Sequence, residues 1–157
     1  MHLEGSCHCK AVTFSLESPH PYPFNRCYCS ICRKTAGSGG YGINLSGVYS
    51  TLRIHSGETS INTYQAKMGD KTSTGIRHFC RECGSALWLY DPTWPELVHP
   101  HASAIDTPLP TPPEVVHLML GSKPEWVQVD QSLVHQNFEE YPEESIADWH
   151  QKRGLEC

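Results

Sequence analysis

The chain has 157 residues, with 12 lysines and arginines against 17 aspartates and glutamates, and a formal net charge of −5 at pH 7. This acidic balance argues against a nucleic-acid-binding protein, which normally presents a basic face. The length predicts a single domain, and no apolar stretch approaches the ~20 residues that a membrane-spanning helix needs, so no membrane association is expected.

Short stretches in which apolar and polar residues alternate recur along the chain and predict strands. They cover residues 11–16, 42–45, 52–55, 61–64, 76–79, 86–90, 115–120 and 126–129. Residues typical of turns, mainly Gly, Pro, Ser and Asp, separate these stretches. The chain is therefore expected to be built largely from short strands.

Two later segments predict other structure. Residues 106–113 contain four prolines, and this segment is expected to be a loop because proline donates no hydrogen bond to a sheet. One helix is predicted near the end of the chain, where acidic residues precede Ile146, Trp149 and His150 and basic residues follow them. The spacing places these three side chains on one helix face, where His150 is expected to pack or to lie at the surface rather than to bind a metal.

Seven of the eight cysteines fall into three tight clusters. The clusters are Cys7 with Cys9, then Cys27 with Cys29 and Cys32, and finally Cys80 with Cys83. Thiolates one to three residues apart can bind one zinc ion together, whereas a Cys-x-Cys disulfide would be strained. No secretory signal is visible at the start, so the chain is expected in the reducing cytoplasm, or in the nucleus, where thiols bind metal rather than pair.

Seven sulfurs divide into a closed site of four and an open site of three. Four thiolates complete a tetrahedral zinc site that stabilises a fold, whereas three leave a position where a ligand can bind and react. Cys80 and Cys83 lie between two predicted strands, and Gly84 allows the tight turn that such a pair needs. The spacing alone does not decide which other pair completes the closed site.

The second site has competing interpretations. Its fourth ligand could be water or a small thiol such as glutathione, because soft sulfur suits a sulfur-rich site. A side chain could instead close it and make both zinc ions structural; the candidates are His8, His20, His55, His78 and Cys157. Cys157, alone at the end of the chain, is otherwise expected to be an exposed residue without a role.

Three segments around the cysteines resemble the glutathione-dependent formaldehyde-activating (Gfa) family, also called the CENP-V/GFA domain. They are GSCHCKAV at 5–12, CYCSICRK at 27–34 and FCRECGS at 79–85, and two later segments, SAID at 103–106 and SKPEW at 122–126, also resemble family motifs. The resemblance covers roughly residues 4–130. It implies a mainly β, Mss-four-like sandwich of twisted antiparallel sheets with zinc knuckles. We expect this domain at residues 4–138 and the short C-terminal helix in a tail at 139–157.

The resemblance also implies the metal content and its ligands. Two zinc ions are expected per chain, a structural one held by Cys7, Cys9, Cys80 and Cys83, and a catalytic one held by Cys27, Cys29 and Cys32. Two positions depart from the family pattern, with Tyr28 where the family more often has histidine and Ser103 where its loop has glycine.

Members of this family are generally described as carbon–sulfur lyases that form or cleave the C–S bond of S-hydroxymethylglutathione. The expected partner is therefore a small-molecule thiol adduct, with Arg33, Lys34 and Lys123 as the predicted contacts of its carboxylates. Two alternatives are a non-catalytic zinc protein that binds glutathione or another thiol, and a structural zinc scaffold for a protein partner. The sequence predicts no particular oligomeric state.

Overall fold

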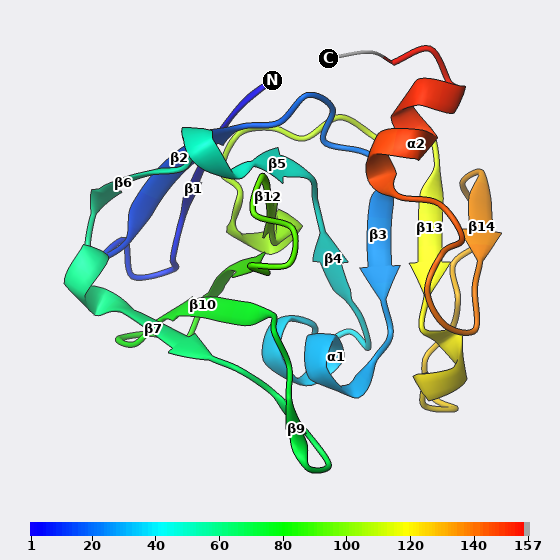
Figure 1. Cartoon of the computed structure of the whole chain (residues 1–157), viewed down its shortest axis with the longest axis horizontal. Coiled ribbons are helices and arrows are strands. Elements are labelled where there is room, and N and C mark those ends of the chain that lie inside the picture. The colour runs from blue at the N-terminus through cyan, green and yellow to red at the C-terminus, as the bar shows by residue number, and fades with distance from the viewer. Residues whose placement is uncertain (156–157) are drawn as a thin grey trace.

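The computed structural model describes residues 1–155, which form four small sheets and two α-helices (Figure 1). The first sheet contains β1 (His2–Ser6), β2 (Thr13–Glu17) and β6 (Arg53–Ser56). The central sheet has the order β5 (Gly47–Val48), β12 (Leu97–Pro100), β11 (Ala86–Tyr90), β10 (Ile76–Cys80) and β7 (Ile61–Tyr64). The third has the order β14 (His135–Asn137), β13 (Val115–Leu118), β3 (Phe24–Cys27) and β4 (Gly42–Asn44).

Smaller elements complete the architecture. A hairpin joins β8 (Lys67–Met68) to β9 (Lys71–Thr72), and short 3-10 helices cover Tyr49–Thr51, Glu58–Ser60, Ala102–Ala104 and Leu120–Ser122. The α-helices are α1 (Ser30–Ala36) and α2 (Ile146–Lys152). In Figure 1 the first sheet lies on the left, the third on the right, and α1 between β10 and β3. Within residues 1–155, no helix combines the length and the apolar character that crossing a bilayer requires.

The prediction of a mainly β fold is confirmed. The strands predicted at 61–64 and 86–90 coincide with β7 and β11. Most strand pairs are antiparallel, but β13 runs parallel to both β3 and β14, which the expected antiparallel sandwich did not include. All four residues of β13 are buried, as is usual for a strand flanked by parallel neighbours.

The strand predicted at residues 126–129 is wrong, because this segment is irregular. The backbone N–H of Val127 donates to the carbonyl of Pro124, which closes a turn, and the Lys123 ammonium donates to the Val127 carbonyl. These local bonds occupy the polar groups that a sheet ladder would need. Val127 is buried, Val129 is half-buried and Trp126 is exposed, so the segment has an apolar side without being a strand.

Two other predictions concern helices and loops. Residues 106–113 form no helix or strand, as their prolines predicted. The predicted C-terminal helix is α2, with Trp149 and His150 buried on one face. The helix α1 was not predicted, because seven residues are too few to show a helical repeat.

Two groups of buried side chains form the core. The larger lies between the first and central sheets, where the rings of Phe14 and Trp88 meet edge to face with centroids 4.9 Å apart. The smaller lies under the third sheet and includes Cys27, Cys32 and Val116. The cysteine cluster at 27–32 is thus anchored in a packed core rather than carried on a loose loop.

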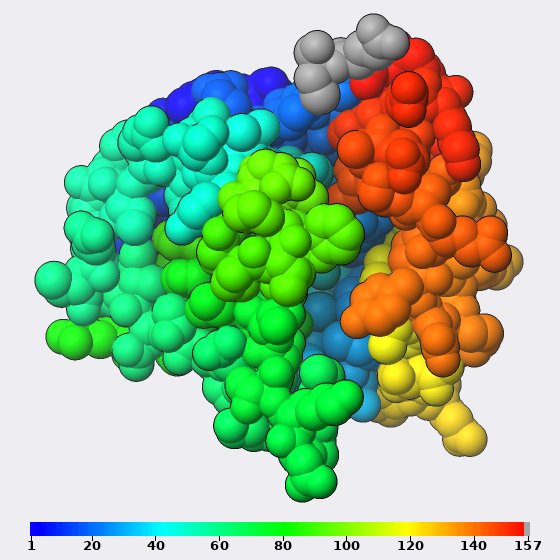
Figure 2. Space-filling view, in the orientation of Figure 1, coloured from blue at the N-terminus to red at the C-terminus, as the bar shows by residue number. Residues whose placement is uncertain are grey.

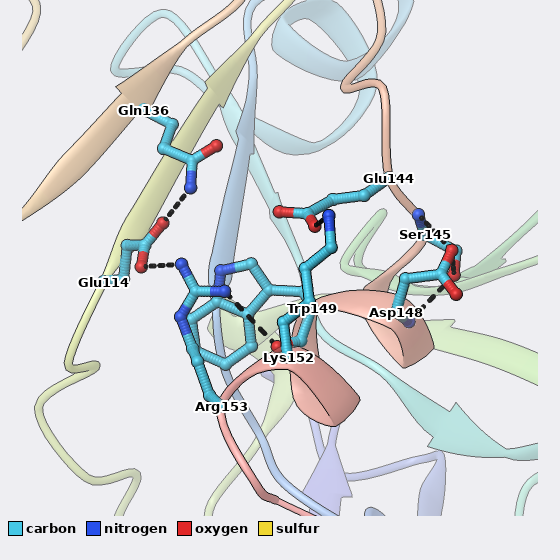
Figure 3. Close-up of polar contacts among 8 residues, drawn as sticks. All are labelled: Glu114, Gln136, Glu144, Ser145, Asp148, Trp149, Lys152 and Arg153. Atoms are coloured by element: carbon cyan, nitrogen blue, oxygen red, sulfur yellow. Dashed lines mark hydrogen bonds and ion pairs between the residues drawn. The ribbon is translucent and has the colours of Figure 1, made fainter.

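Helix α2 is fixed to the third sheet by polar contacts (Figure 3). The Arg153 guanidinium donates to the Glu114 carboxylate at 2.5 Å, and its charge lies 4.0 Å from the centre of the Trp149 ring. Gln136 of β14 donates to the other oxygen of Glu114. The helix begins at a capping box, in which the Ser145 hydroxyl and the Asp148 carboxylate each bond the other's backbone N–H. The tail is therefore bonded to Glu114, the residue before β13, which Gln136 of β14 also holds.

Candidate metal centres and the adjoining cavity

Four sulfur atoms from two distant segments converge on one point. The Sγ atoms of Cys7, Cys9, Cys80 and Cys83 all lie within 4.8 Å of one another. Neighbouring sulfurs are 3.5 Å apart between Cys7 and Cys9, and 3.8 Å apart between Cys9 and Cys80. A tetrahedral zinc ion with Zn–S bonds of about 2.3 Å would separate its sulfurs by about 3.8 Å, so this cluster fits a four-coordinate zinc site.

Both pairs of this cluster lie on tight turns. After β1 the Val12 backbone N–H donates to the Cys7 sulfur, and Lys10 takes a left-handed conformation with φ of 63° that reverses the chain. After β10 the N–H of Gly84, with φ of 76°, donates to the Cys80 carbonyl. A left-handed φ favours glycine, which explains Gly84 in the second turn. Each turn holds two sulfurs at the spacing that one metal ion requires.

The loop after the central sheet supports the first turn. The backbone N–H of Asp106 donates to the carbonyl of Glu4, and its carboxylate accepts a hydrogen bond from Ser6 and pairs with Lys10 at 3.5 Å. The SAID segment at 103–106 therefore fixes the end of β1 beside Cys7, which gives this segment a structural role.

A second cluster contains three sulfurs. The Sγ atoms of Cys27, Cys29 and Cys32 also lie within 4.8 Å of one another. Cys27 ends β3, Cys29 is the N-cap of α1 and accepts a hydrogen bond from the Cys32 N–H, and Cys32 lies in the first turn of α1. Within residues 1–155, no histidine, aspartate, glutamate or further cysteine joins this group. Cys157, the remaining sequence candidate for closing it, lies outside the described residues.

Electrostatics in this second cluster favour a bound cation. Hydrogen bonds from Cys27, and then from Cys32, lower the pKa of Cys29 well below its ordinary value. The same contact with Cys29, followed by the contact with Cys32, raises the pKa of Cys27. One thiolate thus forms readily, whereas further ionisation gathers negative charge in a small volume. A divalent cation removes that penalty, so three adjacent thiols fit a metal ion with one free coordination position.

A cavity of about 370 Å³ lies beside this cluster, between α1 and strands β7, β10 and β11. Arg77 links the two features, because it lines the cavity while its guanidinium Nη2 lies 3.5 Å from the Cys32 sulfur. Nη1 of the same guanidinium lies 3.4 Å from the hydroxyl of Thr35. His101 also lines the cavity; it is 2% exposed, and its Nδ1 has no hydrogen-bond partner in the described structure.

The C-terminal segment also approaches the three sulfurs. In Figure 2 the blue segment that includes α1 lies at the bottom of a recess, between green residues of the central sheet and orange residues near position 140. Phe138 packs against the core group that contains Cys27 and Cys32. Tyr141, further along the same segment, is 74% exposed.

The three residues predicted to contact the substrate carboxylates lie in different surroundings. Lys34 is exposed on α1, and Arg33 is half-buried with its Nε lacking a hydrogen-bond partner in the part of the chain described. Lys123 directs its ammonium to the carbonyls of Pro124 and Val127. None of the three lines the cavity, whereas Arg77 does. The sequence gives no sign of this position of Arg77, because the pattern at residues 76–79 predicts only a strand.

Tyr28 has a role in the core. It is fully buried, and its hydroxyl lies 2.7 Å from Nδ1 of His117 on β13. The other ring nitrogen of His117 lies 3.0 Å from the carbonyl oxygen of Asp130. The tyrosine that replaces histidine at position 28 therefore links the end of β3 to β13 and to the loop after it.

Comparisons with known proteins agree with this geometry. Residues 2–121 match the sequence profile of the family described as glutathione-dependent formaldehyde-activating enzyme. The chain belongs to this family. Its relatives include a protein of Halomonas elongata, named as a candidate glutathione-dependent formaldehyde-activating enzyme, which is 64% identical over 157 residues and covers 99% of both chains. The formaldehyde-activating family assignment made from the cysteine segments is thereby confirmed.

The fold is also similar to a solved structure. A crystal structure of a Rhodobacter sphaeroides protein superposes with a TM-score of 0.55 at 28% identity, covering 68% of this chain and 91% of that one. The family profile ends at residue 121, so Tyr141 and helix α2 lie beyond the segment that defines the formaldehyde-activating family.

Proposed function

We propose that this chain is a zinc-dependent carbon–sulfur lyase that acts on a glutathione thioadduct such as S-hydroxymethylglutathione. The observation that carries the proposal is a group of three thiols, without a fourth side-chain ligand among residues 1–155, beside a cavity of about 370 Å³. This volume falls within the range of sites for small molecules. Family membership supports glutathione as the thiol.

The two sulfur clusters would have different roles, one structural and one catalytic. Cys7, Cys9, Cys80 and Cys83 would hold a structural zinc ion that joins the end of β1 to the turn after β10. Cys27, Cys29 and Cys32 would hold the catalytic one. When bound there, zinc would supply a Lewis acid that stabilises a substrate sulfur as thiolate near neutral pH.

The reaction requires neither oxidant nor reductant. In cleavage, the electron pair of the C–S bond moves to sulfur, the hydroxyl proton leaves the adduct oxygen, and the carbonyl of formaldehyde forms; synthesis is the reverse. The incoming substrate sulfur would approach the cluster at Cys29, which is half-buried. The buried Cys27 and Cys32 would fix the cluster to the core. The Arg77 guanidinium beside Cys32 would offset the negative charge that three thiolates and a substrate thiolate bring together.

Turnover of S-hydroxymethylglutathione by the purified chain tests this proposal, with Cys29→Ser as the comparison. The proposal expects turnover by the wild type and a loss of at least about 100-fold in the variant, which should keep the metal of the four-thiol cluster. Full rate in a correctly folded Cys29→Ser protein would refute it. Glutathione binding without any rate enhancement would instead support the non-catalytic thiol-binding alternative.

A further inference from the structure

The cavity beside the three thiols contains a positive charge without a carboxylate partner among residues 1–155. Arg77 is half-buried on β10, and no carboxylate of residues 1–155 lies within ion-pair distance of its guanidinium. The side chains that line the cavity include no aspartate or glutamate among the described residues. Within this part of the chain, the hydrogen-bond partners of the Arg77 side chain are the Cys32 sulfur and the Thr35 hydroxyl. A guanidinium that is partly removed from water and has no carboxylate partner favours an anion in the space beside it.

A second side chain of the same cavity also lacks a partner. His101 is buried beneath the cavity wall with its Nδ1 unbonded in the described structure. Burial, followed by the charge of Arg77, lowers the pKa of His101 to about 4, so the ring is neutral near pH 7. A neutral ring can carry its proton on Nδ1 and donate it to a ligand oxygen. Buried polar atoms normally have partners, so this atom is consistent with a group that arrives with a ligand.

We propose that Arg77 and His101 form a carboxylate subsite of this cavity, which holds an anionic group of the thiol substrate while its sulfur lies at the Cys27, Cys29 and Cys32 cluster. This inference rests on the proposed function for the identity of the substrate. Glutathione bears its carboxylates a short, flexible distance from its sulfur, and the 3.5 Å contact between Arg77 and Cys32 places subsite and cluster side by side. The subsite would therefore select thiols that carry a carboxylate.

Two ligands distinguish binding at the carboxylate subsite from binding at the sulfur cluster. S-Methylglutathione keeps the carboxylates but its capped sulfur is a poor metal ligand, whereas N-acetylcysteamine has a free thiol and no carboxylate. Calorimetry should show that Arg77→Gln weakens S-methylglutathione binding at least about 10-fold, the size expected for hydrogen bonds to a charged group. Binding of N-acetylcysteamine should weaken by a clearly smaller factor, because this ligand loses only the charge of Arg77 beside the Cys32 sulfur. Lys71→Gln, which removes an exposed charge from the β8–β9 hairpin, is the matched control and should change neither.

Equal losses for both ligands would overturn the subsite, because they would show that Arg77 acts only on the thiolates. Unchanged binding of S-methylglutathione would overturn it too. If Arg77→Gln fails to fold, Arg77→Lys takes its place, with a selective loss of about 3-fold or more expected for S-methylglutathione. A wild type that never turns over S-hydroxymethylglutathione but shows the selective loss would retain the subsite and remove the lyase assignment.

Discussion

Replacing Cys80 with serine should unfold the domain. Cys80 is fully buried at the end of β10, and its sulfur lies 3.8 Å from that of Cys9, 71 residues earlier in the chain. A structural zinc ion contributes on the order of 10–16 kcal/mol in small zinc-finger peptides, whereas whole domains are stable by only about 5–15 kcal/mol. Even a partial loss of about 5 kcal/mol would lower the melting temperature of a chain of this size by about 10–20 °C.

Cys29→Ser is the matched control, since it also removes one sulfur but from the three-thiol cluster. Thermal denaturation followed by circular dichroism, with metal analysis of each protein, should give a soluble, folded Cys29→Ser protein and an insoluble or strongly destabilised Cys80→Ser protein. A Cys80→Ser protein with wild-type melting temperature would refute the reasoning, because the four-thiol cluster would then contribute little to the fold.

Two further predictions concern stability. Arg153→Ala leaves the buried Glu114 carboxylate with Gln136 alone, and urea denaturation should show a loss of about 2–4 kcal/mol, somewhat below that of a fully buried pair because Arg153 is one-third exposed. Lys152→Ala removes the exposed ammonium that pairs with Glu144, and it should cost clearly less than Arg153→Ala. Equal losses in both variants would contradict this role of α2. Burial lowers the pKa of His101 to about 4, against about 6.5 in the unfolded chain. As the pH falls, the unfolded chain therefore binds the proton before the folded chain does. The free energy of unfolding should decrease as the pH drops from about 6.5 to about 4. Between about pH 7 and pH 5 the wild type should lose about 2 kcal/mol more than His101→Gln, and identical pH profiles would show that the ring is not buried in its neutral form.

Much of the fold could be predicted because alternation is a local signal. Residues 61–64 and 86–90 alternate clearly, and they form β7 and β11. The parallel pairing of β13 with β3 joins segments about 90 residues apart, and no local pattern encodes such a partner. The segment at 126–129 also alternates, but Pro124 and the Lys123 ammonium bind its backbone locally and exclude a ladder.

The sulfur clusters were easier to predict than the cavity. Spacing shows which thiols can act in pairs, and the family resemblance supplied a grouping that matches the two clusters in the structure. Arg77 and His101 are 24 residues apart in sequence. They line one cavity only because β10, which holds Arg77, and β12, which ends just before His101, belong to one sheet. One sequence feature could have indicated Arg77. It is a cation three residues before Cys80, on the strand that leads to the turn with the candidate metal ligands Cys80 and Cys83.

X-ray absorption at the zinc edge, recorded on the purified chain with and without glutathione, tests most directly whether the second cluster keeps a coordination position for a substrate sulfur. Four sulfurs at one site and three at the other average to about 3.5 per zinc. The proposed function predicts two zinc ions per chain and a rise of this average to about 4 when glutathione is added. A value of 4 before glutathione, or one that glutathione leaves unchanged, would contradict it.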